Sequence, residues 1–194
     1  YAEQKFLKDI PLLYVLTVTS RTEGRQRMNG LFIGRGRRIF EEAVALSQEK
    51  NLTFVDQPFQ KVVVYLDPSE FKSTWLGNKA IYRTRMAIAD DGDLIILAPG
   101  VRQFGEDPDN DRFIRKYGYV GRKRILDLYQ KNDEGLKSNL SVAAHLIHGS
   151  SDGRFRITYA VEKLTREEVE GVNFHYMPYR EAVKKYNPET LTDG

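Results

Sequence analysis

The stretch KVVVYLD, residues 61–67, is a nearly continuous run of apolar and β-branched residues. A strand with one face in water alternates apolar and polar residues, whereas an unbroken apolar run is typical of a parallel strand that is covered on both faces. The stretch LIILAPG, residues 94–100, has the same character. Two such runs with a helical segment between them favour an α/β fold with a largely parallel sheet.

The rest of the chain alternates in the same way. Further strands are expected at 11–18 (buried), 31–34, 52–55 and 154–162 (one exposed face). Helices are expected at about 37–50, 72–89, 111–118, 123–132, 140–149, 165–172 and 179–187, the sixth opening with a Thr165–Glu168 capping box. Residues 19–30 predict a loop or hairpin, and DGD at 91–93 predicts a turn. No linker or repeat marks an internal boundary, so we expect one α/β domain over residues 1–194, its parallel or mixed sheet flanked by helices.

Composition narrows the function classes. The chain of 194 residues has 41% hydrophobic and 29% charged residues and a net charge of +3, which is ordinary for a globular protein. It has no cysteine, which excludes disulfides, thiolate metal sites and cysteine nucleophiles. No apolar run is long enough to span a membrane and no signal peptide is visible, so we expect a cytoplasmic protein that binds neither membrane nor nucleic acid.

Two segments resemble binding motifs. In GRGRRIF, residues 34–40, a strand passes through two glycines into a helix, as in a phosphate-binding turn, but the third glycine of the dinucleotide motif is replaced by Ile39. The alternative is a tight turn with a solvated basic edge. The loop after residue 100 carries Glu106, Asp107, Asp109 and Asp111, which form either a cation site or a solvated acidic loop.

The segment HLIHGSSDGR raises a third possibility. His145 and His148 are three residues apart, and Asp152 follows four residues later, a set that can bind a metal ion. The alternative is that one histidine caps the helix C-terminus while the other is partly buried. His175 is the one further histidine in the chain.

The helix expected at 72–89 has two apolar faces. At 100° per residue, a face of small residues would pack on the sheet. The opposite face carries five larger side chains: Trp75, Lys79, Tyr82, Arg83 and Met86. An exposed aromatic patch marks an interface or a ligand groove. The alternative is that a neighbouring loop covers the aromatic rings while Lys79 extends into solvent.

The order of these segments, with VVVYLD, then WLGNKAIYRTRMA, then DGDLIILAPG, resembles the C-terminal domain of the nickel-pincer lactate racemase family. The family helix reads Tyr-Gln-Ala-x-Lys-Gly, and its pattern places Trp75 at the tyrosine, Leu76 at the glutamine and Lys79 at the lysine. The resemblance covers roughly residues 11–105. Arg35 stands where the family has an acid, and Leu76 replaces a glutamine that holds substrate, so the substrate contacts differ and lactate is not implied.

The resemblance implies a racemase or epimerase of 2-hydroxy acids. Hydride passes from C2 to a pyridinium mononucleotide that carries nickel, and the nickel ligand and the catalytic histidine pair belong to the N-terminal domain of such enzymes. That domain has no counterpart here. We therefore expect this chain to be the C-terminal domain of a two-domain protein, with no catalytic residue, metal or cofactor of its own and no activity alone.

The expected role of this domain is to bind the substrate carboxylate and close the cleft. Lys79 is the anion-binding residue in this hypothesis, with Trp75 and Tyr82 as walls and Arg83 assisting. The partners would be a small 2-hydroxy acid and the N-terminal domain of the same protein. A different class stays open: a non-enzymatic domain that binds an anion, a nucleotide or a protein through GRGRRIF and the aromatic face.

Overall fold

A computed structural model describes residues 1–22, 24–131, 133–187 and 190. Contacts divide the chain into two compact units, Tyr1–Val55 and Asp56–Gly194, which are described separately below. The connecting residues have no linker composition, so no boundary between two units was predicted at this point.

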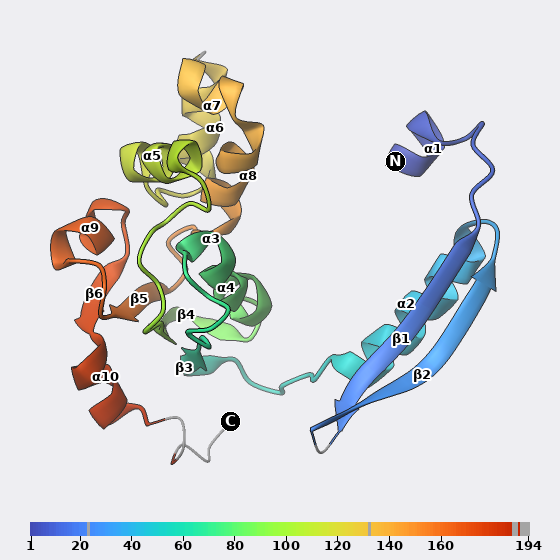
Figure 1. Cartoon of the computed structure of the whole chain (residues 1–194), viewed down its shortest axis with the longest axis horizontal. Helices are drawn as coiled ribbons and strands as arrows, with labels where there is room; N and C mark the ends of the chain where they lie inside the picture. The colour runs from blue at the N-terminus through green and yellow to red at the C-terminus, as the bar shows by residue number, and fades with distance from the viewer. Residues whose placement is uncertain (23, 132, 188–189, 191–194) are drawn as a thin grey trace. The chain divides into compact units, whose positions relative to one another are not determined.

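The first unit is a β-hairpin with a helix on one face (Figure 1). Strand β1 (Tyr14–Thr22) pairs antiparallel with β2 (Arg25–Gly34), so the segment 19–30 forms a hairpin. Helix α1 (Ala2–Phe6) precedes them and α2 (Arg37–Asn51) packs on the hairpin. Gly36, the N-cap of α2, has φ 86°, which only glycine adopts readily.

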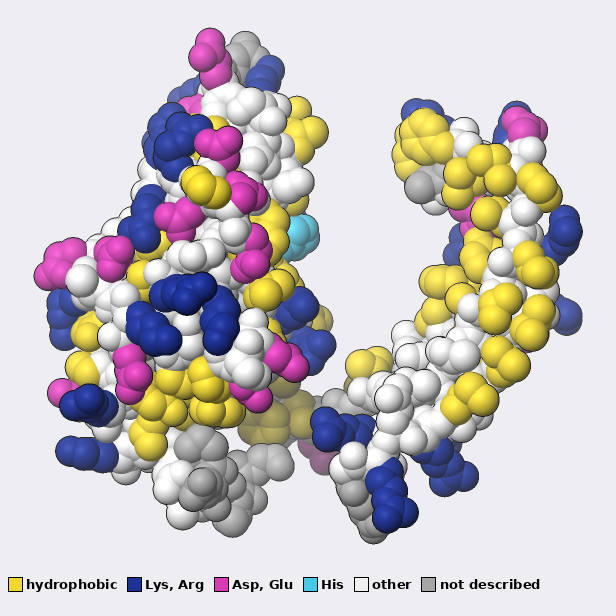
Figure 2. Space-filling model, in the orientation of Figure 1, with side chains coloured by type: hydrophobic (Ala, Val, Ile, Leu, Met, Phe, Trp, Pro, Cys, Tyr) yellow, Lys and Arg dark blue, Asp and Glu magenta, His cyan; other side chains and the backbone are white. Residues whose placement is uncertain are grey.

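Two expectations about this unit are wrong. The strand predicted at 11–18 is buried on one face only, where Val18 is 4% exposed, because α2 covers only that face of the hairpin. On the uncovered face Val15, Leu31 and Ile33 are exposed, and Figure 2 shows hydrophobic side chains spread over the visible side of this unit. Residues 52–55 form no strand, and Phe54 is 87% exposed. The apolar runs in this segment predicted burial, but the unit consists of a hairpin with one covering helix, which cannot bury both faces of the strands.

The second unit contains the predicted parallel sheet. Its strands follow one another in space as in sequence: β3 (Phe59–Tyr65), β4 (Ile88–Leu97), β5 (Arg156–Val161) and β6 (His175–Pro178). All three pairings are parallel, which confirms the α/β class. The DGD segment is not a separate turn but lies within β4, where Asp91 has φ 62°. Strand β5 is buried on both faces rather than one, and β6 was not predicted.

Helices connect these strands (Figure 1). Between β3 and β4 lie α3 (Thr74–Gly77) and α4 (Lys79–Thr84). Between β4 and β5 lie α5 (Pro108–Tyr117), α6 (Arg122–Gln130), α7 (Glu134–Ser138) and α8 (Leu140–His148). Helix α9 (Arg166–Gly171), with the predicted capping box, leads to β6, and α10 (Tyr179–Lys185) follows.

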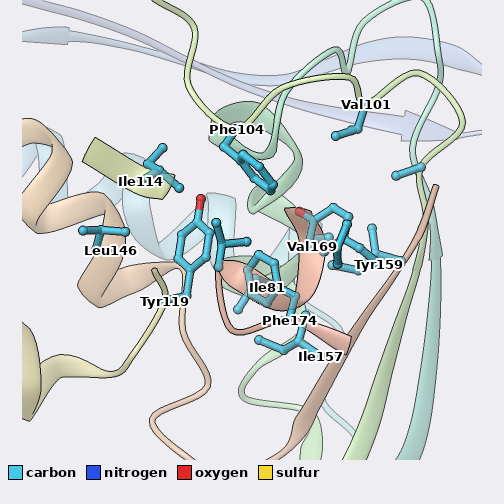
Figure 3. Packing of buried hydrophobic residues seen from close by; sticks show 14 of the residues in the cluster. Ile81, Val101, Phe104, Ile114, Tyr119, Leu146, Ile157, Tyr159, Val169 and Phe174 are labelled. Carbon is cyan, nitrogen blue, oxygen red and sulfur yellow. The ribbon is translucent and has the colours of Figure 1, made fainter. Parts of the chain in front are cut away.

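The main core lies on one face of this sheet. Figure 3 shows its large side chains, including Ile81, Phe104 and Tyr159, all of which are fully buried. Tyr119 stacks on Phe174 within the same cluster, with ring centroids 4.4 Å apart. The opposite face of the sheet has a smaller core in which α10 covers β4 and β5 with Ala182 and Tyr186.

The single helix predicted at 72–89 is instead broken at Asn78. The side chain of Ser73 caps α3, and Asn78 ends it after one turn. Gly77 lies so close to β5 that a Cβ there would be 3.1 Å from the hydroxyl of Tyr159. Helix α4 then ends at Thr84, and Ile88 already belongs to β4. The predicted helix is confirmed over residues 79–84. It is interrupted at Asn78, whose buried side chain bonds to Tyr159 and His145 in distant parts of the chain.

Gly100 offers a test of the packing beyond β4. A Cβ at this position would lie 2.7 Å from both the carbonyl oxygen of Phe71 and Cα of Pro68, which are backbone atoms. We expect Gly100→Ala to lower the free energy of unfolding by about 1–3 kcal/mol, because the backbone has to move. Urea unfolding followed by the emission of Trp75 reports on this unit.

The matched control for this substitution is Gly171→Ala. No atom lies within 4 Å of a Cβ at Gly171, which is the last residue of α9. Its stability should be unchanged or raised by up to about 1 kcal/mol, since alanine favours a helix over glycine. Equal unfolding midpoints for the two variants would contradict the described packing.

Candidate functional site

Two of the predicted site residues meet at His145. The ring of Trp75, in α3, stacks on the imidazole of His145 with centroids 4.3 Å apart and planes inclined by 26°. The hydroxyl of Tyr82, in α4, lies 3.1 Å from Nδ1 of the same imidazole. His145 belongs to helix α8, so a helix, and not the loop of the alternative prediction, packs against this aromatic face. The rings are nevertheless not all buried, since Tyr82 remains 37% exposed.

The other side of His145 is bonded to buried polar groups. Its Nε2 lies 2.9 Å from the hydroxyl of Tyr119 and 3.4 Å from Nδ2 of Asn78. The hydroxyl of Tyr159 in turn donates to Oδ1 of Asn78 at 2.6 Å. We call this group the His145 cluster: Trp75, Asn78, Tyr82, Tyr119, His145 and Tyr159. It joins α3, α4, α8 and β5 through a continuous network.

Burial controls the protonation of this cluster. His145 is 7% exposed, and burial, followed by the nearby charge of His148, lowers its pKa to about 4. The imidazole is therefore neutral at pH 7. Burial also raises the pKa of Tyr82, an effect that the positive charge of Arg85 partly offsets. Both tyrosine hydroxyls on His145 consequently keep their protons, because burial raises the pKa of Tyr119 even further.

A groove of about 580 Å³ opens beside the cluster. It is lined by Tyr82, Arg85, Ala144, His145 and His148. Its walls come from the end of α4 and from α8, and no acidic side chain is among the five. An aromatic wall flanked by an arginine and a histidine is suited to a small organic anion.

Lys79 and Arg83 are both exposed on α4. In the part of the chain that the structure describes, neither takes part in an ion pair or a cation–π contact. Their assignment as anion-binding residues stays a prediction, as do the roles of Trp75 and Tyr82. The structure brings Trp75 and Tyr82 together on His145. The two cations, Lys79 and Arg83, are close to them in sequence and lie at the surface.

Sequence reasoning missed three members of the cluster: Asn78, Tyr119 and Tyr159. The hydrogen bonds that unite them span 26 to 81 residues of sequence, so no local pattern reveals them. One signal was present, because asparagine inside a predicted helix favours a break or a cap.

The HLIHGSSDGR segment does not form the metal site considered above. His145 is buried in the cluster, His148 is exposed, and Asp152 accepts a hydrogen bond from the backbone N–H of Arg122 at the start of α6. Ser150 donates to the carbonyl of Ile147 rather than to a histidine. Across the described ranges no group of three or more His, Cys, Asp or Glu side chains is placed to hold a metal ion.

The acidic loop has structural partners. Asp107 caps α5, and Asp111 accepts from the N–H groups of Phe104 and Gly105 while pairing with Arg115 at 2.6 Å. Asp109 pairs with Arg112. The hydroxyl of Ser73 donates to Glu106. Each of the four carboxylates therefore has a protein partner without a cation.

The basic edge of GRGRRIF is also paired. Arg37 and Arg38 each form an i,i+4 ion pair on α2, with Glu41 and Glu42. This arrangement fits the reading of a tight turn with solvated charges, and it leaves less free positive charge for an anion.

None of the described helices is both long and apolar enough to cross a bilayer.

Comparison with known proteins supports the fold. No protein-family model matches the chain, and no curated protein sequence matches it. Among solved structures, a protein from Thermotoga maritima is similar over 99% of this chain, with 24% identity and a TM-score of 0.74. The lactate racemase apoprotein from Thermoanaerobacterium thermosaccharolyticum is similar over 85% of this chain, with 14% identity and a TM-score of 0.50. The chain spans 48% and 39% of those two proteins, so it corresponds to less than half of each.

The buried His145 predicts a specific dependence of stability on pH. Its pKa in the folded state is about 4, below the value of about 6.5 in an unfolded chain. The unfolded state therefore binds the proton first as the pH falls. Stability contributed by neutral His145 is complete above about pH 6.5, declines on acidification and is lost by about pH 4. The total is on the order of 3 kcal/mol.

The measurement compares unfolding free energies of the natural chain and His145→Phe between pH 7 and pH 4. Phenylalanine keeps a ring against Trp75 but cannot titrate. The unfolding free energy of the variant should therefore fall less steeply with decreasing pH, and the difference in slope should correspond to at most about one bound proton. Carboxylates titrate equally in both proteins. Parallel curves would show that His145 titrates normally.

Proposed function

We propose that this chain is the C-terminal domain of a racemase or epimerase that inverts C2 of a 2-hydroxy acid. Its task is to bind the substrate carboxylate and to form one wall of a cleft whose other wall is an N-terminal domain of the same protein. The observation that carries the proposal is the segment WLGNKAIYRTRMA, which matches the family lysine at Lys79, on a fold similar to that of a lactate racemase.

The physical role of Lys79 follows from its surroundings. An exposed ammonium attracts a carboxylate at 4 Å by about 1 kcal/mol in bulk water, and several times more when a closing domain removes water. Trp75 and Tyr82 are large, and the network behind them holds them in place. A carboxylate fixed in this way places C2 of the substrate next to its reaction partner, which is catalysis by positioning.

The nickel-pincer nucleotide that the family uses does not fit the residues of this chain. Cysteine is absent, both nitrogens of His145 are engaged within the cluster, and His148 and His175 lie on different elements. We derive no step through the group, and we propose that the N-terminal domain of the parent protein binds it.

The proposal predicts the activity of the parent protein. The full-length protein, produced with its cofactor and offered single enantiomers of lactate, malate and phenyllactate, should form the opposite enantiomer of at least one, measured by chiral chromatography. The 194-residue chain under the same conditions should form none. A full-length protein that inverts no 2-hydroxy acid, or an active 194-residue chain, would refute the proposal.

A second prediction concerns Lys79. In the full-length protein, Lys79→Ala should lower kcat/KM by roughly 10- to 100-fold, the effect of removing a charged hydrogen-bond partner. The control is Lys184→Ala, which removes an equally exposed helical lysine in α10. If Lys79→Ala is as active as this control, the face of α4 is an interface only. Far-ultraviolet circular dichroism should be the same for both variants.

A further inference from the structure

We propose that the preferred substrate of the parent protein has a second carboxylate, which the groove beside the His145 cluster binds through Arg85 and His148. The proposal rests on the function proposed above and names its substrate class, a 2-hydroxy dicarboxylic acid. In that function Lys79 binds the carboxylate next to C2, and the two basic side chains of the groove are left without a role.

The groove lies beside the proposed position of the first carboxylate. Tyr82 lines it, and Lys79 is three residues earlier, one turn away on the same side of α4. Arg85 follows as the C-cap residue of α4 and keeps a helical backbone, with φ −54° and ψ −29°. Six residues of helix rise by about 9 Å, and both cationic side chains are long and flexible. A short molecule that passes Tyr82 can therefore meet one cation at each end.

The guanidinium of Arg85 is available to a ligand. The side chain is half-buried, and no ion pair or cation–π contact of the described chain includes it. Its backbone is held, since the carbonyl oxygen accepts from Nη1 of Arg154 at 3.2 Å. Its charge reaches the wall of the groove: burial raises the pKa of Tyr82, and Arg85 offsets part of that rise. An arginine placed in this way is suited to a carboxylate.

The two helices that line the groove carry no acid. From residue 71 to residue 89 the chain has four lysines and arginines and no aspartate or glutamate, and residues 135–151 contain no acid either. These stretches include all of α4 and α8. Asp90, the first acid after Arg85, is paired with Arg154 at 2.7 Å. A second anion in the groove thus meets no like charge from its own walls, and the positive side chains attract it.

His148 adds a second basic group. It is exposed in the last turn of α8, and its ring meets the ring of Tyr82 edge to face, with centroids 6.4 Å apart. An imidazole donates a hydrogen bond, and in its protonated form it also carries a positive charge. The groove has a volume of about 580 Å³, so the methyl group of lactate would leave most of it empty. A longer acid with an anionic end uses both the space and the charge.

The first experiment compares matched substrates in the full-length protein. Malate and 2-hydroxybutanoate have equal chain lengths and differ in whether the far end is a carboxylate or a methyl group; 2-hydroxyglutarate and 2-hydroxypentanoate form a second such pair. We expect kcat/KM to be at least roughly tenfold higher for the diacid in one pair, the effect of a charged hydrogen bond. A smaller preference in both pairs overturns the proposal. A still higher value for 3-phosphoglycerate overturns the dicarboxylic class, because the groove would then select a phosphate.

Variants assign the preference to the groove. Arg85→Gln and His148→Gln should each lower the ratio of kcat/KM for the diacid to kcat/KM for its neutral analogue by roughly tenfold. The matched control is Arg180→Gln, which removes an exposed arginine in α10 and should leave this ratio unchanged. A ratio in either groove variant equal to that of the control overturns the proposal.

A binding measurement separates failure of this proposal from failure of the proposed function. On the 194-residue chain, long-range ¹H–¹⁵N spectra follow the imidazole of His148, assigned by its absence in His148→Gln, during titration with malate or 2-hydroxybutanoate at one pH and ionic strength. Malate should shift these signals further. Equal shifts, including no shift with either acid, overturn the proposal. A full-length protein that inverts no 2-hydroxy acid refutes the proposed function instead, and the titration then decides whether the groove binds the second carboxylate.

Discussion

The buried amide of Asn78 is the constraint on which the site depends. It is fully inaccessible to solvent, and a buried amide costs a few kcal/mol unless its hydrogen bonds are made. Its two ends bond to Tyr159 in β5 and His145 in α8. A helix break, a central strand and a distant helix are thereby held in one arrangement. The position of Trp75 and Tyr82 against His145 follows from that arrangement, because both side chains flank the break.

Much of the larger unit could be predicted from sequence because its elements are locally consistent. The unbroken apolar runs at 61–67 and 94–100 became neighbouring parallel strands. Capping signals were equally reliable, since Thr165 and Glu168 form the expected reciprocal pair of hydrogen bonds. These elements could be predicted because a strand covered on both faces, or a helix end, requires particular residue types within a short stretch of sequence.

The remaining features depend on partners that a short window does not contain. The hairpin strand at 11–18 has a buried-strand composition, yet only one helix covers it, so Val15 is exposed. Strand β6 has four residues, too few for a periodic signal. For the candidate site, sequence reasoning identified Trp75 and Tyr82 from a helical face, but Tyr119 and Asn78 joined them through contacts across 26 and 67 residues.

The two kinds of polar group around this face have complementary strengths. In the proposed function, Lys79 attracts the substrate anion over a distance but orients it weakly, because its charge lies in water on a flexible side chain. Tyr82 carries no charge, but its contact with Nδ1 of His145 at 3.1 Å and the network behind that ring hold its hydroxyl in place. Selecting one orientation of a small hydroxy acid requires direction as well as attraction. In the proposed function Lys79 supplies the attraction and Tyr82 the fixed position, which gives a physical reason for placing a lysine within an aromatic face.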